Sequence, residues 1–251
     1  MILDSHIHSG QCKSFQITQT KDYYCLSCAS SEEEFIQQKK NESEFRKRND
    51  RKTIFCGFGV HPWYLSNKNL ELLEEKLKSN SIDFIGETGL DYFSPELRNT
   101  AENQREFFEK QIKLALEYDK VLLVHGRKCI EDFFRLKDLL KKLRAVVFHG
   151  WSGTYIEAEK MLSEGNNFFF SFGKELIKGR KKSVECAERL PSGVILMETD
   201  APFMNLKGED ATEPEQIISV YKEVCRLKKI SFDPDLNCFA ESKLIDLLIK
   251  N

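Results

Sequence analysis

The chain has 251 residues, with 38 Lys and Arg against 40 Asp and Glu, which gives a formal net charge of −2. Hydrophobic residues make up 41% of the chain, enough to bury a core, so the composition excludes a disordered or fibrous protein. No apolar run approaches the roughly 18–20 residues of a transmembrane helix, and the first residues lack the pattern of a signal peptide. Eight cysteines are too sparse for a disulfide-rich secreted scaffold, so we expect reduced thiols in a cytoplasmic protein.

Short apolar runs alternate with longer segments of helical period along the whole chain. Several of the runs are continuously apolar, as expected for parallel strands that are buried on both faces. The predicted strands are Ile2–Asp4, Tyr23–Ser27, Ile54–Gly59, Phe84–Glu87, Val121–His125, Ala145–His149, Phe168–Phe172 and Val194–Glu198. The predicted helices include Glu102–Tyr118, Ile130–Leu143, Tyr155–Ser163, Glu215–Leu227 and Ala240–Ile249.

This alternation predicts an α/β protein in which residues 1–251 form a single (β/α)8 TIM barrel domain. A doubly wound open sheet would also fit the alternation, but it needs no eighth strand. The segment Ser9–Asp22, between the first two strands, is polar and has no amphipathic pattern. We therefore expect a shortened first crossover, with its helix truncated or absent.

Two segments are rich in cations. Lys39–Lys52 is interpreted as the solvated face of a helix. Lys174–Lys182 holds five cations and one Glu directly after the seventh predicted strand. A loop at that place opens onto the C-terminal rim of a barrel, so this segment is a candidate for contact with phosphate.

A cluster of metal-ligand residues is expected at the same rim. Because side chains alternate along an extended chain, His6 and His8 after the first strand point to the same side and can bind one ion. Other such residues come at or just after the ends of later strands: His61, Glu87, His125, His149 and Asp200. The C-terminal ends of barrel strands meet at one rim, where TIM-barrel active sites are built.

The number of ligands indicates two metal ions. A tetrahedral zinc site takes three or four protein ligands, whereas His6, His8, His125 and His149 together with Glu87 and Asp200 exceed that number. They suit two divalent ions that share a bridging carboxylate and a bridging water. Zn²⁺, Mn²⁺ and Mg²⁺ all remain possible, and imidazole-rich coordination favours the transition metals.

The motifs around these residues resemble those of the TatD-type metal-dependent deoxyribonucleases, within the amidohydrolase-like barrels. They occur in order over nearly the whole chain: Asp4-Ser-His-Ile-His8, Gly59-Val-His-Pro-Trp63, Ile85-Gly-Glu-Thr-Gly-Leu-Asp-Tyr92, His125-Gly-Arg127, His149-Gly-Trp-Ser-Gly153 and Glu198-Thr-Asp-Ala-Pro202. The resemblance implies a barrel with two divalent ions that hydrolyses DNA phosphodiesters, often from a 3′ end.

The resemblance also implies roles for single residues. His6, His8, Glu87 and Asp200 would hold one metal, and Glu87 would bridge to a second metal completed by His125 and His149. Glu87 and Asp200 are the catalytic candidates, and Asp200 would accept the proton of the attacking water. His61 and Arg127 look like phosphate or leaving-group contacts, while Asp91, Tyr92 and Glu198 would support the ligands or face substrate. Trp151 departs from the usual motif; it could stack on a base or pack between loop and barrel.

Two other functions remain open. The first is hydrolysis of a small ester, lactone, amide or phosphoester by an enzyme of the same superfamily, since the fold does not determine the substrate. The second is a catalytically inactive barrel used for binding, which the retention of all candidate ligands disfavours. The near-neutral charge does not indicate broad nucleic-acid binding, so we expect local contact with DNA ends or single strands. We expect no membrane contact and no obligatory protein partner.

Overall fold

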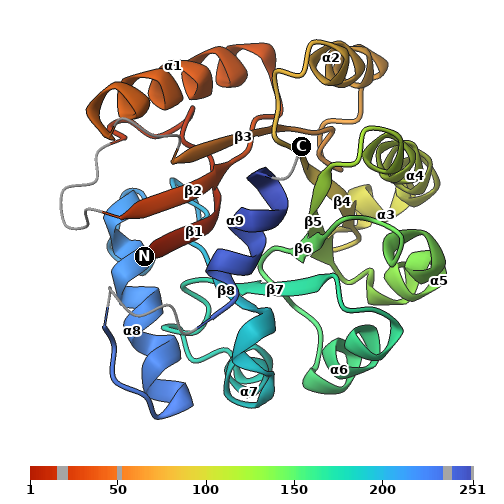
Figure 1. The fold of residues 1–251 in the computed structure, drawn as a ribbon. Coiled ribbons are helices and arrows are strands. Elements are labelled where there is room, and N and C mark those ends of the chain that lie inside the picture. The colour runs from red at the N-terminus through yellow and green to blue at the C-terminus, as the bar shows by residue number, and fades with distance from the viewer. Residues whose placement is uncertain (16–21, 50–52, 234–238, 250–251) are drawn as a thin grey trace.

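The computed structural model describes residues 1–15, 22–49, 53–233 and 239–249 (Figure 1). Eight strands form one sheet in chain order, and each strand pairs in parallel with the next. The strands are β1 Ile2–Ile7, β2 Tyr23–Ser27, β3 Ile54–Phe58, β4 Phe84–Asp91, β5 Val121–Arg127, β6 Val146–Phe148, β7 Phe168–Phe172 and β8 Ile195–Met197. All eight predicted strands are confirmed, although β1, β4 and β5 continue further into the rim than the sequence indicated.

The strands are enclosed by an outer ring of helices, which confirms the TIM-barrel prediction (Figure 1). The α-helices are α1 Glu32–Asn49, α2 Asn67–Lys78, α3 Pro95–Asn99, α4 Ala101–Glu117, α5 Ile130–Leu140, α6 Tyr155–Glu164, α7 Lys181–Arg189, α8 Ile217–Lys228 and α9 Glu241–Ile249. Single 3₁₀ turns, η1 Ser192–Val194 and η2 Pro214–Gln216, precede β8 and α8. The five predicted helices are present, α1 covers most of the basic segment at residues 39–52, and α2, α3 and α7 were not predicted.

The first crossover lacks a helix in its described part, residues 8–15 and 22, as expected. The next connections carry α1, α2 and α4 against the barrel. Where a first helix would otherwise crowd the rim, a hollow of about 560 Å³ opens between Gly10, Glu33 and Tyr64. Among the described residues, the rim is therefore open on the β1–β3 side.

The bottom of the barrel is closed by the last helix. In Figure 1, α9 lies across the centre of the ring of strands. Its Leu244 and Leu248 belong to one apolar cluster with side chains from the strands, such as Leu3, Phe84 and Phe169. Because this end is sealed with apolar side chains, the polar chemistry is confined to the opposite, C-terminal rim. Among the described helices, none is long and apolar enough to cross a membrane.

The barrel closes between β8 and β1 through a buried carboxylate. Asp4 accepts hydrogen bonds from the backbone N–H and the hydroxyl of Thr199, at 2.9 and 2.6 Å. Beyond it, the Asp200 N–H donates to the His6 carbonyl at 3.0 Å. Asp4, the first residue of the Asp4-Ser-His-Ile-His8 motif, thus joins the first strand to the segment after the last strand. We call this pair of contacts the clamp; it lies directly below His6 and Asp200, which are hydrogen-bonded to each other through their backbones.

We expect Thr199→Val to lower the free energy of unfolding by about 1–3 kcal/mol, because the Asp4 carboxylate would lose its hydroxyl donor while remaining buried. Thr88→Val is the matched control, since the buried Thr88 hydroxyl has no hydrogen-bond partner among the described residues. Urea denaturation of both variants measures the difference. Equal losses of stability in the two variants would show that the clamp contributes nothing.

Candidate metal centre

The carboxylate of Glu87 lies at the centre of the rim. Glu87 is only 5% exposed and belongs to β4, whose passage beside β5 requires a glycine at position 89. Gly89 has a φ of 141°, and a Cβ there would lie 2.1 Å from the carbonyl oxygen of His125. Gly89 therefore allows the backbones of β4 and β5 to come close enough for Glu87 to face His125.

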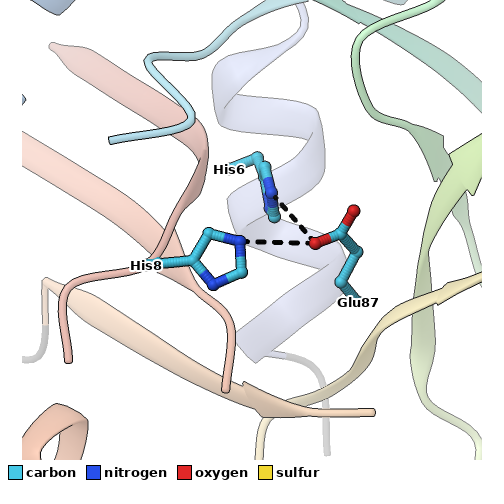
Figure 2. A group of neighbouring side chains, drawn as sticks. All are labelled: His6, His8 and Glu87. Atoms are coloured by element: carbon cyan, nitrogen blue, oxygen red, sulfur yellow. Dashed lines mark ion pairs between the residues drawn. The ribbon is translucent and has the colours of Figure 1, made fainter. Parts of the chain in front are cut away.

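One oxygen of Glu87 faces the histidine pair of β1. The Glu87 Oε2 atom lies 3.4 Å from His6 Nε2 and 3.3 Å from His8 Nε2, as Figure 2 shows. Asp200 approaches from the other side, with its Oδ1 atom 3.3 Å from His6 Nε2 and 3.8 Å from His8 Nε2. Asp200 adopts a positive φ of 54°, a conformation that aspartate tolerates better than most residues. Two imidazoles and two carboxylates thus converge on this side.

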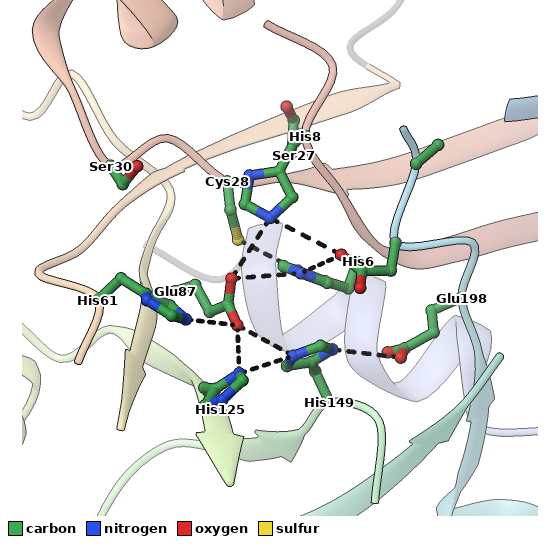
Figure 3. A network of polar contacts seen from close by, with 12 residues as sticks. His6, His8, Ser27, Cys28, Ser30, His61, Glu87, His125, His149 and Glu198 are labelled. Carbon is green, nitrogen blue, oxygen red and sulfur yellow. Dashed lines mark hydrogen bonds and ion pairs between the residues drawn. The ribbon is translucent and has the colours of Figure 1, made fainter. Parts of the chain in front are cut away.

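The other oxygen of Glu87 faces a second set of imidazoles (Figure 3). The Glu87 Oε1 atom lies 2.8 Å from His125 Nδ1 and 2.9 Å from His149 Nε2. These two nitrogens are 3.3 Å apart, close enough to share one ligand. His61 Nε2 lies 3.4 Å from the same oxygen. The structure therefore brings together every imidazole and carboxylate that the sequence assigned to the metals, with Glu87 between the two groups.

Outer carboxylates orient two of these histidines. Glu34, at the start of α1, lies 2.9 Å from His8 Nδ1, and Glu198 lies 3.2 Å from His149 Nδ1. Each carboxylate accepts a hydrogen bond from the Nδ1–H group, so Nε2, which faces Glu87, is the nitrogen that can bind a metal. Glu198 was identified from its motif. Glu34 was not, because it lies on a helix that is brought to His8 only by the fold.

A third outer carboxylate and an indole hold His125. Asp91 Oδ2 lies 3.2 Å from His125 Nε2 and also accepts a hydrogen bond from Trp63 Nε1 at 2.8 Å. Asp91 Oδ1 accepts the backbone N–H of Phe93 at 2.8 Å. This contact places the Nδ1 lone pair of His125 towards Glu87 and gives Asp91 the supporting position that the resemblance implied.

His61 differs from the other histidines in its hydrogen bonding. Its Nδ1 atom accepts the backbone N–H of Trp63 at 3.2 Å, so the proton of the neutral ring lies on Nε2. Burial, which outweighs the attraction of Glu87, lowers the pKa of His61 below its ordinary value and keeps the ring neutral. An Nε2–H group directed at Glu87 Oε1 is a donor and not a lone pair, so His61 is suited to contact a substrate oxygen and not to bind a metal.

The charges of the centre are mutually dependent. Although burial acts in the opposite direction, the nearby imidazoles hold the pKa of Glu87 well below its ordinary value. Burial lowers the pKa of both His8 and His149, but the neighbouring carboxylates outweigh it. Glu34 and Glu87 raise the pKa of His8 to about 10, and Glu198 and Glu87 raise the pKa of His149 well above its ordinary value. Without a metal, protons on the histidines therefore balance the carboxylates.

The residues fit a divalent metal. The Nε2 atom of His6 is buried and has no hydrogen-bond partner among the described residues, although its ring is fixed on the other side by Cys28 Sγ at 3.4 Å from Nδ1. A buried nitrogen without a partner is costly unless something occupies the space before it. A cation between His6, His8 and Glu87 would satisfy that nitrogen and replace the protons on the histidines.

Of the two remaining predicted substrate contacts, Arg127 lies at the rim and Trp151 is buried. Arg127 ends β5, two residues after His125, and its guanidinium lies over the ring of Phe93 at the rim. Of the two alternatives for Trp151, the structure shows packing and not a side chain open to substrate. The indole is 2% exposed and packs against Phe148 and Phe170, at centroid distances of 5.5 and 4.9 Å, because its backbone turns it beneath the rim into the aromatic core.

In the cationic segment at residues 174–182, a candidate for phosphate contact, Lys174 is buried and paired, whereas Lys181 and Lys182 are exposed. Lys174 is 1% exposed, and its Nζ atom donates to Glu209, Thr212 and Gln216. The ammonium group is therefore neutralised inside the fold and unable to meet a phosphate. Lys181 and Lys182 begin α7 and are exposed.

We expect Glu34→Ala to weaken metal binding about 10–100-fold, because His8 would lose the acceptor that fixes its tautomer. Glu33→Ala is the matched control, since the neighbouring Glu33 is exposed and forms no contact with His8. Titration of the metal-free protein with Mn²⁺ or Zn²⁺ in a calorimeter measures the affinities. Equal affinities of the two variants would contradict the assigned role of Glu34.

We expect metal affinity to rise with pH between about 6 and 8. Glu87 and Asp200 have lowered pKa values and are already ionised in this range, whereas the raised pKa of His8, about 10, means that binding must displace a proton. Each displaced proton changes the affinity by about tenfold per pH unit. Calorimetric titrations at several pH values test this, and a constant affinity would show that no proton is displaced.

Comparison with known proteins agrees with this geometry. The family model described as TatD related DNase matches residues 3–237. An uncharacterized metal-dependent hydrolase of Buchnera aphidicola subsp. Baizongia pistaciae is 31% identical over 204 residues, covering 78% of this chain and 73% of its own. The uncharacterized metal-dependent hydrolase YjjV of Escherichia coli is 30% identical over 184 residues, covering 70% of each.

Solved structures share the fold. The crystal structure of the Escherichia coli TatD homolog YjjV superposes with a TM-score of 0.73 at 24% identity, over 99% of this chain and 95% of that one. A TatD family hydrolase from Entamoeba histolytica gives a TM-score of 0.71 at 18% identity, over 92% of each chain. With its rim of imidazoles and carboxylates, the chain belongs to the TatD-related family and is a metal-dependent hydrolase.

Proposed function

We propose that this hydrolase is a deoxyribonuclease that cleaves phosphodiester bonds of DNA ends or single strands with two divalent ions. The shared position of Glu87 supports two ions: Oε2 faces His6 and His8, and Oε1 faces His125 and His149. Asp200 completes the first group of ligands. The excess of imidazoles favours Mn²⁺ or Zn²⁺ over Mg²⁺.

Bound there, the ions would supply an activated water nucleophile and stabilise negative charge on the phosphate. Asp200 is positioned to accept the proton of the attacking water, since its carboxylate lies beside the metal-facing nitrogen of His6. Although burial opposes it, the nearby imidazoles lower the pKa of Asp200, so the carboxylate is ionised and free of a proton of its own. Glu87 holds the two halves of the centre in register. His61 directs its Nε2–H group into the site and donates it to a phosphate oxygen or the leaving group.

Exposed aromatic rings around the rim carry the assignment of a nucleic-acid substrate. Trp63 and Tyr64 are 49% and 58% exposed and lie 5.2 and 6.0 Å from the ring of His61. On the opposite side, Phe203 is 45% exposed and lies 5.2 Å from the ring of His8. Exposed aromatic rings form stacking platforms for the bases of single strands. Trp63, and not Trp151, is the tryptophan available for stacking.

The alternative substrate, a small ester, lactone or amide, explains these rings less well. A small molecule held at Glu87 would not need aromatic surfaces on both sides of the centre. The near-neutral net charge is compatible with DNA because contact is limited to the rim.

End-labelled single- and double-stranded oligonucleotides incubated with Mg²⁺, Mn²⁺ or Zn²⁺ test the proposal. We expect cleavage by the wild type and a loss of more than about 100-fold in Glu87→Ala, since loss of an outer partner alone costs 10–100-fold. Glu106→Ala, on the exposed face of α4, is the control. Absence of cleavage with every metal, together with hydrolysis of a small ester or lactone, would refute the deoxyribonuclease assignment.

A further inference from the structure

A second hollow, of about 420 Å³, lies on the rim beside the metal centre, between the ends of β4, β5 and β6 and the start of α7. Its cationic lining residues are Arg127, Lys128 and Lys182, and its aromatic one is Phe93. The hollow lies close to the metal centre because its lining residues follow the proposed ligands in sequence. Arg127 comes two residues after His125, or roughly 7 Å along an extended strand.

The other walls are tied to the same strands. Phe93 comes two residues after Asp91, whose carboxylate contacts His125. Ser152, three residues after His149, donates its hydroxyl to the carbonyl oxygen of Gly126. The hollow is therefore built from the residues that immediately follow the proposed metal ligands and their support, and a strand bound at the metals would reach it within a short distance.

The cations of this hollow are available to a ligand. Within the described residues, Arg127, Lys128 and Lys182 form no ion pair and no side-chain hydrogen bond. The one carboxylate in the lining, Glu157, is already used: it accepts the backbone N–H and the hydroxyl of Thr154, at 2.6 and 2.8 Å, in the capping box of α6. Three cations against one engaged carboxylate leave the hollow positive.

Phe93 gives the hollow an aromatic surface. The ring is 50% exposed, with the Arg127 guanidinium 3.9 Å and the Lys128 ammonium 4.7 Å from its centroid. Lys128 has a positive φ of 56°, a strained conformation for a residue with a side chain. α5 also begins at this edge with Ile130, which lines the hollow. Cations and an aromatic face together match the two parts of a nucleotide, its phosphate and its base.

The opposite side of the centre lacks these features. The hollow exposed by the shortened first crossover is lined by Glu33 and Glu34 and by no lysine or arginine. A polyanionic strand would be repelled there and attracted towards Arg127. The acidic residues on one side of the metal centre and the cations on the other therefore favour a substrate whose phosphates extend towards Arg127.

We propose that the hollow between Phe93, Arg127, Lys128 and Lys182 binds the nucleotide that adjoins the scissile phosphate, with its phosphate between the cations and its base against Phe93. This inference rests on the proposed deoxyribonuclease function. The backbone phosphates of the bound strand lie on the β4–β7 side of the rim, whereas the acidic hollow on the β1–β3 side, which Tyr64 also lines, receives no phosphate.

The test compares Lys182→Glu with Lys181→Glu in the metal-loaded enzyme. Both residues are exposed in the first turn of α7, but only Lys182 lines the hollow, so the charge change is matched. Each variant is assayed with a single-stranded oligonucleotide and with bis(4-nitrophenyl) phosphate, a diester with a single phosphate, which leaves none for Lys182 when that phosphate lies at the metals. We expect Lys182→Glu to raise KM for the oligonucleotide about tenfold with little change in kcat.

The salt dependence supplies a second readout that a folding defect would not imitate. Loss of one phosphate contact should reduce the slope of log KM against log salt by about 0.7 for a single strand, and activity on the small diester should stay at the wild-type level. Lys181→Glu should resemble the wild type with both substrates.

The possible failures are distinguishable. If the wild type cleaves the oligonucleotide and the two variants behave alike, the hollow is not a nucleotide subsite although the proposed function stands. If Lys182→Glu loses activity equally on both substrates, Lys182 acts on the centre itself and the inference is wrong. If the wild type hydrolyses only the small diester, the deoxyribonuclease function fails and this inference fails with it.

Discussion

The burial of one carboxylate, Glu87, is the constraint on which the rest of the rim depends. An ionised side chain in a site with 5% exposure is stable only when counter-charges and donors surround it. Imidazoles from β1, β5 and the end of β6, together with His61 after β3, meet this need. The same imidazoles form two groups, one around each carboxylate oxygen of Glu87. The histidines that stabilise the buried charge of Glu87 are therefore also the ones that can hold metals.

Around this centre the charges are arranged by layer. Glu34, Asp91 and Glu198 lie behind the imidazoles and are engaged in orienting them. Many of the acidic residues that bring the net charge to −2 are thus turned inward or paired, while cations without partners gather at one side of the rim. Net charge alone is therefore a weak guide to what this surface binds, because local placement decides the field that a substrate meets.

The fold separates stability from chemistry at the two ends of the barrel. α9 seals the N-terminal ends of the strands with apolar side chains, and the clamp between Asp4 and Thr199 joins the last strand to the first. Because these contacts hold the backbone, the C-terminal rim can accommodate strained residues such as Asp200 and Lys128, both with positive φ. In the described part of the first crossover, residues 8–15 and 22, no helix covers the rim, and a hollow lies there beside the centre.

The sequence by itself determined the barrel, the eight strands and the convergence of His6, His8, Glu87, His125, His149 and Asp200, because strand alternation and strand ends are local patterns with one geometric outcome. Only the tertiary structure decided the surroundings of those residues. Glu34 reaches His8 from a separate helix, and Lys174 is neutralised by residues more than thirty positions later. The exposed tryptophan is Trp63 and not Trp151, since burial depends on how each loop packs over its neighbours, which no local pattern encodes.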